Sequence, residues 1–433
     1  SRPSRGPDDG HSRAELTPTS STPRTEPPAP LARPSMPHAC ALVRESTARV
    51  ADRPGCKVTI DDAAIARVIS RMSNDVVASL LGPRRFDADG VHFNDPDDPE
   101  LTARYILCVD AINFCFWPDH EAIRDAKAQR DKWAKYPVTA QYLVKQDGFD
   151  NDGEFKVPVR TEHEEGPNAL LFRGMEYEHV AGGLREALET DRRALDAERL
   201  TLIDGPKLRE MLGWPRPLPL EDERARLLRE VGRGLVDHFG GSAARLIAAA
   251  NGRADVLVDL VVRIFGGFRD VAIDPRDGSQ VFLYKRAQIF VGDLWGRFNG
   301  RGLGRFDESI KELTMFADYR VPVVLRNMGI LRYEPNLARK VDQHNFSTAD
   351  IVAAGSAEEV DVRACTVQAV ERMRRALEER IEKEPELNLT IPGEVDEKFV
   401  TSVALDWFLW TEGERQRDDA GAGRHHRTLT VFY

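Results

Sequence analysis

The chain has 433 residues, of which 30% are charged and 41% are apolar, and its formal net charge is −10. These proportions are typical of a globular protein with room for one large or two ordinary domains. The acidic balance argues against broad binding to a nucleic-acid backbone, which needs clustered lysine and arginine. It still allows a local basic pocket for a single phosphate.

The cysteines and the apolar runs bear on the compartment. There are five cysteines, none in C-x-x-C spacing, and the odd number argues against a disulfide framework or a structural zinc site. We find no signal-peptide core and no apolar run of about 18 residues, the length that a membrane span needs. We therefore expect a cytoplasmic protein in a reducing environment, with no membrane partner.

The first part of the chain differs in composition from the rest. Residues 1–38 contain nine of the 26 prolines and almost no large apolar side chains. Such a segment cannot bury enough surface to offset the entropy lost on ordering, so we expect a disordered, proline-rich tail. The remainder, 39–433, is predicted to form one domain. Its last twenty residues are polar, and we expect them to be loose.

Helical periodicity dominates that domain, and alternating strand patterns are rare. Asp61 and Asp62 are placed to cap a helix that carries Ile65 and Ile69 on one face. Residues 221–239 form a second amphipathic pattern, ended by glycines, and residues 243–264 a third with a break at Asn251 and Gly252. The fold class predicted from these patterns is mainly α, with few short strands.

The stretch from Lys285 to Leu331 places acids, bases and aromatic rings close together. Asp293 stands beside Trp295, Asp318 lies between Phe316 and Tyr319, and Lys285 and Arg320 are possible anion binders. An ordinary interpretation competes with a functional one, because an aspartate beside an aromatic ring is usually a helix cap or a surface charge. The chemistry of the stretch alone leaves the two interpretations open.

Four motifs favour the functional interpretation. They are Lys-Arg-Ala-Gln-Ile at 285–289, Asp-Leu-Trp at 293–295, Met-Phe-Ala-Asp-Tyr-Arg-Val-Pro at 315–322 and Asn-Phe-Cys-Phe-Trp at 113–117. Together they closely resemble the queuosine salvage protein family, over roughly residues 41–412. The chain departs from the family pattern at Val323, where the family commonly has glutamine, which puts one polar contact in doubt.

The resemblance implies both a fold and an activity. The fold would be helical and similar to that of DNA glycosylases. The activity would be hydrolysis of the N-glycosidic bond of queuosine 5′-phosphate, which releases queuine for salvage into tRNA modification. The partner would then be a small-molecule nucleotide, with no direct contact to nucleic acid. The oligomeric state is not predicted.

The transition state of such a reaction resembles an oxocarbenium ion, which a carboxylate beneath C1′ would stabilise. The base is a 7-deazaguanine, so protonation at N7 cannot help it to leave, and the demand on that carboxylate rises. We assign this role to Asp318, which lies in the most family-specific motif. Asp293 is the second candidate, as a catalytic partner or as the acceptor for the cationic amine of the base.

The remaining candidates would bind substrate. Lys285, Arg286 and Arg320 are possible partners of the 5′-phosphate, because charge-assisted contacts are the strong ones; the alternative is that they form structural ion pairs. The candidates for contact with the base and its surroundings are Asn113, Phe114, Phe116, Trp117, Trp295, Phe316 and Tyr319, although core packing is an alternative role for each ring. No metal and no cofactor is expected.

Two other functional classes remain open. One is a nucleosidase or glycosylase that acts on another modified nucleotide, which a comparison of free nucleotides with duplex DNA would separate. The other is a non-catalytic nucleotide-binding protein, for which loss of either aspartate would have been the sequence signal. Both aspartates are present.

Overall fold

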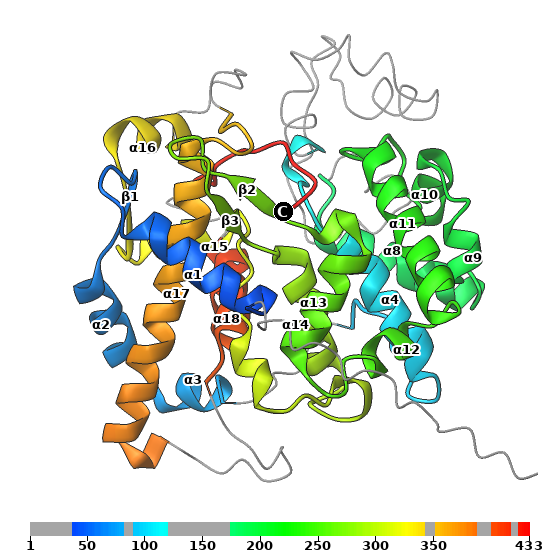
Figure 1. Cartoon of the computed structure of the whole chain (residues 1–433), viewed down its shortest axis with the longest axis horizontal. Helices are drawn as coiled ribbons and strands as arrows, with labels where there is room; N and C mark the ends of the chain where they lie inside the picture. The colour runs from blue at the N-terminus through cyan, green and yellow to red at the C-terminus, as the bar shows by residue number, and fades with distance from the viewer. Residues whose placement is uncertain (1–36, 82–89, 120–173, 343–350, 388–399, 417–422) are drawn as a thin grey trace, which may run out of the picture. The chain divides into compact units, whose positions relative to one another are not determined.

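The computed structural model describes residues 37–81, 90–119, 174–342, 351–387, 400–416 and 423–433. Within these ranges the chain is mainly helical, as predicted (Figure 1). The proline-rich tail lies outside the described residues, apart from Pro37 and His38, and the proposed likeness to DNA glycosylases stays a prediction. None of the described helices combines the length and apolar character that crossing a bilayer requires.

The elements follow one another along the chain with mostly short connections. The N-terminal elements are α1 (Ala39–Ala51), β1 (Val58–Ile60), α2 (Asp62–Arg71), α3 (Asn74–Ser79) and α4 (Pro99–Ala111). The middle elements are α8 (Tyr177–Thr190), α9 (Ala197–Leu200), α10 (Gly205–Met211), α11 (Glu221–Phe239), α12 (Ala243–Ala248), α13 (Ala254–Ile264), η2 (Gly266–Phe268), β2 (Val271–Ile273) and β3 (Gln280–Phe282). The C-terminal elements are α14 (Lys285–Arg297), η3 (Gly302–Gly304), η4 (Glu308–Glu312), α15 (Val321–Asn327), β4 (Leu331–Tyr333), α16 (Pro335–Asp342), α17 (Ala357–Lys383), η6 (Pro385–Leu387) and α18 (Ser402–Gln416).

The strands of the described chain form two small antiparallel pairs. β1 pairs with β4, which places Thr59 opposite Arg332, and β2 pairs with β3 as a hairpin, which places Ala272 opposite Val281. The first pair joins segments that are far apart in sequence, and its β1 strand packs on α17. The strands therefore tie helices together and do not form a layer of their own.

Local signals explain several helix boundaries. The Asp61 carboxylate accepts a hydrogen bond from the Ala64 amide at 2.8 Å and caps α2, as predicted. α11 spans Glu221–Phe239, the predicted range, and ends at Gly240 in the left-handed conformation (φ 56°). The predicted break after α12 falls where Asn251 and Gly252 both have positive φ.

α14 is the central helix of the fold. Every residue from Lys285 to Gly296 is buried, because α4, α13 and the 3₁₀ helix η3 all pack around it (Figure 1). A helix enclosed on all sides is expected to be apolar, yet Lys285, Gln288 and Asp293 are among its buried residues. Buried polar groups carry a desolvation cost, so their presence marks this helix as the place to look for a site.

Close packing onto α14 depends on one glycine. A Cβ atom at Gly292 would lie 2.8 Å from Cζ of Phe316 and 3.1 Å from Cγ1 of Val403. The missing side chain lets the Phe316 ring and the start of α18 approach the helix. As a result, the segment that contains Asp318 and the helix that contains Asp406 both lie near α14.

The prediction that the end of the chain is loose is wrong for residues 423–433. His426, Arg427, Thr428 and Tyr433 are at most 2% exposed. The segment is held by its backbone: the Arg427 carbonyl accepts the Val352 amide at 2.9 Å, and the Thr428 carbonyl accepts the Trp117 indole N–H at 3.3 Å. Burial of this segment does not require apolar side chains, because the backbone hydrogen bonds that hold it do not depend on side-chain type.

Candidate active site

The charge of Lys285 acts on the carboxyl groups of four buried or half-buried aspartates. Asp110 comes from the last turn of α4, Asp293 from α14, Asp318 from the segment before α15, and Asp406 from α18. Burial lowers the pKa of Lys285 to about 8, and the negative charges of Asp318, Asp110 and Asp406 each act in the opposite direction. Arg286, Arg297 and Arg320 also act on single members of this group, whereas Lys285 acts on all four acids. Four acids gathered in this way suit a ligand that brings positive charge or hydrogen-bond donors.

Asp318 is held by backbone amides at the start of α15. Its Oδ1 atom accepts hydrogen bonds from the amides of Arg320 at 3.0 Å and Val321 at 2.9 Å. Burial raises the pKa of Asp318, while Lys285 and these two amides lower it. The second oxygen, Oδ2, makes no hydrogen bond within the described part of the chain. One oxygen is thus used to fix the carboxylate, and the other is available to a substrate.

Asp293 lies about two turns from the start of α14 and is 5% exposed. Burial raises its pKa well above the ordinary value, and the nearby Asp110 raises it further. The Trp407 side chain lowers it through a hydrogen bond, and the Trp407 ring stacks on Trp295 with centroids 6.0 Å apart and planes 17° apart. Trp295 therefore packs against another indole beside Asp293.

Asp110 was not predicted from the sequence. It is completely buried, and neither carboxyl oxygen has a hydrogen-bond partner among the described residues. Burial raises its pKa well above the ordinary value, against the influence of Lys285 and Arg286. An unpaired buried carboxyl group costs about 1–3 kcal/mol, which is easier to understand at a functional site than in a structural core.

Asp406 was also not predicted from the sequence. Its Oδ1 accepts the amide of Phe316 at 3.0 Å, so this carboxylate connects α18 to the segment that leads into Asp318. Its pKa is raised well above the ordinary value, first by burial and then by Asp318. Because Asp406 is buried and already holds the Phe316 amide, we expect it to position the segment that contains Asp318.

Asn113 and Lys285 are brought together by the backbone. The Lys285 ammonium donates to the Asn113 carbonyl at 3.0 Å, which is the one hydrogen bond that this side chain makes among the described residues. Asn113 itself is half-buried. The predicted motif at 113–117 therefore reaches the cluster through a main-chain oxygen.

The aromatic residues that follow Asn113 pack elsewhere. Phe114 lies between two buried arginines, 4.2 Å from the guanidinium of Arg224 and 5.2 Å from that of Arg286. Arg286 in turn donates to the carbonyls of Ala111 and Gly267. Phe116 lies 4.9 Å from Arg224, and the Trp117 indole donates to Thr428. Each of these residues thus has a packing partner that explains its position without a ligand.

Arg320 and Tyr319 have partners on the other side of Asp318. The Arg320 Nε atom pairs with Glu414 Oε1 at 2.8 Å, and the Tyr319 ring lies 4.7 Å from the ring of His425. Glu414 also approaches Glu176 and Glu178, with one carboxylate oxygen of each residue within 4.8 Å of the others. Hard cations prefer such oxygens, yet Glu414 is already paired, and we assign no ion to this cluster.

Arg363 of α17 joins the two segments that present Lys285 and Asp318. It is 2% exposed, and its Nε donates to the Ala317 carbonyl at 3.0 Å while its Nη1 donates to Asp270 Oδ1 at 2.9 Å. Asp270 receives the Lys285 amide on its other oxygen at 3.3 Å. One guanidinium therefore spans from the first residue of α14 to the residue before Asp318.

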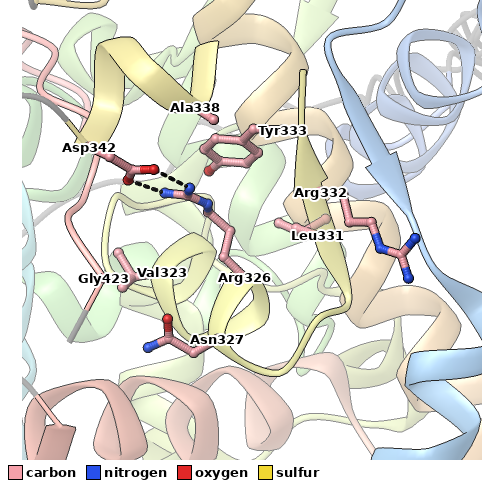
Figure 2. A pocket seen from close by; sticks show the side chains of 9 residues that line it. All are labelled: Val323, Arg326, Asn327, Leu331, Arg332, Tyr333, Ala338, Asp342 and Gly423. Carbon is pink, nitrogen blue, oxygen red and sulfur yellow. Dashed lines mark hydrogen bonds and ion pairs between the residues drawn. The ribbon is translucent and has the colours of Figure 1, made fainter. Parts of the chain in front are cut away.

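A surface cavity of about 480 Å³ lies away from this cluster, between α15, β4 and α16 (Figure 2). Figure 2 shows Arg326 paired with both oxygens of Asp342, at 3.0 and 2.9 Å, beneath the ring of Tyr333. Val323, the position that departs from the family pattern, lines this cavity. None of the four clustered aspartates does, and the charges that Figure 2 displays are already paired.

The chain is similar to proteins of one family along most of its length. A family model described as queuosine salvage protein matches residues 91–433. A Dictyostelium discoideum protein named queuosine 5′-phosphate N-glycosylase/hydrolase is 38% identical over 334 residues, which cover 77% of this chain and 79% of that protein. A Sphaerobacter thermophilus protein of the same name is 36% identical over 391 residues, with 90% and 97% covered. A Bos taurus protein of that name is 28% identical, with 90% and 98% covered. The chain belongs to the queuosine salvage protein family.

Proposed function

We propose that this protein hydrolyses the N-glycosidic bond of queuosine 5′-phosphate and releases queuine. The observation that supports this most directly is the group of Asp110, Asp293, Asp318 and Asp406, which share the charge of Lys285. Two of them, Asp293 and Asp318, lie in family motifs. Water is the second substrate: its oxygen joins C1′, one of its protons goes to the departing base, and the C1′–N bond breaks.

The charge of the cluster suits this substrate. Queuosine has a cationic amine on its base, and positive charge develops on the sugar in the transition state. A buried group of acids stabilises both more strongly than exposed acids would, because water does not screen them. The same excess of acids is unfavourable for an anionic ligand, so the 5′-phosphate needs a cationic partner, for which Lys285 and Arg320 are the candidates.

Asp318 is our candidate for the carboxylate that faces C1′. Two backbone amides fix its Oδ1, and Oδ2 is left for the sugar or for the attacking water. Hydrogen bonds to the charged form and the charge of Lys285 lower the pKa of Asp318, against the burial that raises it overall. Asp293, beside the Trp295–Trp407 stack, is the candidate for the amine of the base.

The test is product analysis of purified protein with queuosine 5′-monophosphate. We expect free queuine and ribose 5-phosphate by liquid chromatography and mass spectrometry. We expect Asp318→Asn to lower turnover by about two to three powers of ten, the usual effect of losing one electrostatic stabiliser. Its affinity for free queuine should change little, because the charge acts mainly in the transition state.

Asp293→Asn is the matched variant, and it should weaken queuine binding as well as turnover. If Asp318→Asn is folded and retains near-normal turnover, the assignment of Asp318 is wrong and Asp293 becomes the leading catalytic candidate. If wild-type protein binds the nucleotide without releasing base, it is a binding protein and the proposal fails.

A further inference from the structure

Two cysteines far apart in sequence meet outside the candidate active site. Cys56 lies in the turn between α1 and β1, and Cys365 lies in the buried half of α17. Their Sγ atoms are 3.5 Å apart, and both are free thiols. The contact joins the N-terminal segment to the long helix against which α1, α2 and β1 pack.

The two thiols differ in exposure and in the direction of their pKa shifts. Cys56 is half-buried, and its pKa is lowered chiefly by the hydrogen bond with Cys365, although burial and the neighbouring Asp361 act in the opposite direction. Cys365 is buried, and its pKa is raised by the same hydrogen bond and by burial. An accessible thiol with a lowered pKa next to a second thiol is the usual arrangement of a pair that oxidises reversibly.

We propose that Cys56 and Cys365 are a site of reversible disulfide formation, for which a peroxide is the oxidant. The Cys56 sulfur attacks the O–O bond of hydrogen peroxide, becomes a sulfenic acid, and one water is released. The Cys365 sulfur then attacks the Cys56 sulfur, the S–S bond forms and a second water leaves. Overall, two thiols and one peroxide give one disulfide and two waters, so the sulfurs are oxidised and the peroxide oxygens are reduced.

The geometry requires only a small movement. A disulfide bond is about 2.05 Å long, so the two sulfurs must approach by about 1.5 Å. Cys56 lies outside any helix or strand, and its amide donates a long hydrogen bond to the Arg53 carbonyl at 3.4 Å. The bond would close a very long loop of chain, and the model of loop entropy predicts a larger stabilisation for longer loops.

The experiment exposes the full chain to a small excess of hydrogen peroxide, blocks the remaining thiols with N-ethylmaleimide and maps the peptides by mass spectrometry. We expect a cross-linked pair that contains Cys56 and Cys365 and that dithiothreitol separates. The thermal midpoint of the oxidised protein should be several degrees higher than that of the reduced protein. Cys108→Ser, a change at a buried cysteine of α4, should leave the cross-link unchanged.

Two variants make the order of the steps testable. Cys365→Ser should stop the cross-link and leave Cys56 as a sulfenic acid that dimedone captures, whereas Cys56→Ser should give neither product. The proposal is overturned if Cys56 goes to the sulfinic acid with no cross-link in wild-type protein. It is also overturned if Cys365 pairs with a different cysteine, or if the cross-linked protein is less stable than the reduced one.

Discussion

The charge of Lys285 changes within the range of ordinary buffers. Its pKa is lowered from 10.5 to about 8 by burial, so it is cationic below pH 8 and neutral above it. Because the unfolded state binds this proton up to pH 10.5, the lysine disfavours folding at neutral pH, and that penalty diminishes as the pH rises from about 8 to 10.5. Because the charged lysine destabilises the folded state, we expect its charge to serve the function of the protein.

We predict that this use is the 5′-phosphate. Then kcat/KM for queuosine 5′-phosphate should fall as the pH rises through about 8, while kcat/KM for the unphosphorylated nucleoside should change less. Lys285→Met should weaken binding of the nucleotide about tenfold to a hundredfold more than binding of the nucleoside. This is the usual effect of losing a charge-assisted contact. Arg320→Met is the matched variant, and equal losses on both substrates would mean that the residue tested is structural.

Asp110 is a residue at which stability and activity should change in opposite directions. Its carboxyl oxygens lack partners in the described chain, and burial raises its pKa far above 3.8. The free-energy cost of this group in the folded state therefore increases as the pH rises above 3.8. Replacement by leucine, of similar size, should raise the free energy of unfolding by about 1–3 kcal/mol at pH 7, and by less at pH 4, while turnover falls.

Asp406→Leu is the control for that measurement, because Asp406 accepts the Phe316 amide and its loss would leave that amide unpaired. Chemical denaturation should show the Asp406 variant to be less stable than wild-type protein. A destabilised Asp110→Leu variant would show that Asp110 has a structural partner, and undiminished turnover would remove it from the candidate site.

At the scale of elements, the helices with strong local signals could be predicted from the sequence. The cap at Asp61, the ends of α11 and the break at Asn251 depend on neighbouring residues, and each was found where the pattern placed it. The site could be predicted only in part. Asp293 and Asp318 lie in one informative stretch, whereas Asp110 and Asp406 reach the cluster through helix packing, which leaves no local signal.

Packing also explains why some predicted site residues do not join the aspartate cluster. Phe114 and Arg286 both lie within motifs, yet the Phe114 ring packs against the guanidinium groups of Arg286 and Arg224. A motif identifies a segment, and the side chains within it divide between site and core according to neighbours contributed by distant segments. The roles proposed for these two residues stay predictions.

Arg363 connects α17 to both halves of the candidate site. A substitution that changes the shape of this side chain but keeps its charge should therefore lower activity while the protein stays folded. Arg363→Lys keeps the charge but cannot reach Ala317 and both oxygens of Asp270 together. We expect kcat to fall by about tenfold to a hundredfold, because small displacements of catalytic groups have effects of this size. KM should change little, and the circular dichroism spectrum should be that of the wild type.

Arg372→Lys is the matched control on the same helix. Arg372 pairs with Asp52 and Asp62 near the surface, so kcat should not change. Arg363→Met, by contrast, leaves Asp270 buried without its partner and should lower the free energy of unfolding by about 3–5 kcal/mol. If Arg363→Lys has wild-type kcat, the arginine holds the fold together and does not position the site.

At the scale of the whole molecule, the family match and the folded unit have different limits. The family model begins at residue 91, yet α1 and α2 pack against α17 and belong to the same compact unit, Pro37–Tyr433. Cys40, Val43 and Val50 of α1 are at most 2% exposed. His38 pairs with Asp259 at 2.8 Å, and the Ala39 amide donates to the same carboxylate at 2.7 Å. The first helix is therefore anchored at its start and along its length.

This anchoring predicts sharply different results for two truncations. A chain that begins at Pro37 keeps every described contact of α1, and we expect turnover and thermal midpoint within error of the full chain. A chain that begins at Arg53 loses α1 and exposes the facing surface of α17; burial of one large apolar side chain contributes about 1.5–3 kcal/mol, so removal of three or more should leave little folded protein. Turnover and thermal unfolding measured on both chains decide the matter: loss of activity in the first would show that residues 1–36 contribute to the catalytic unit, and a stable, active second chain would show that α1 is dispensable.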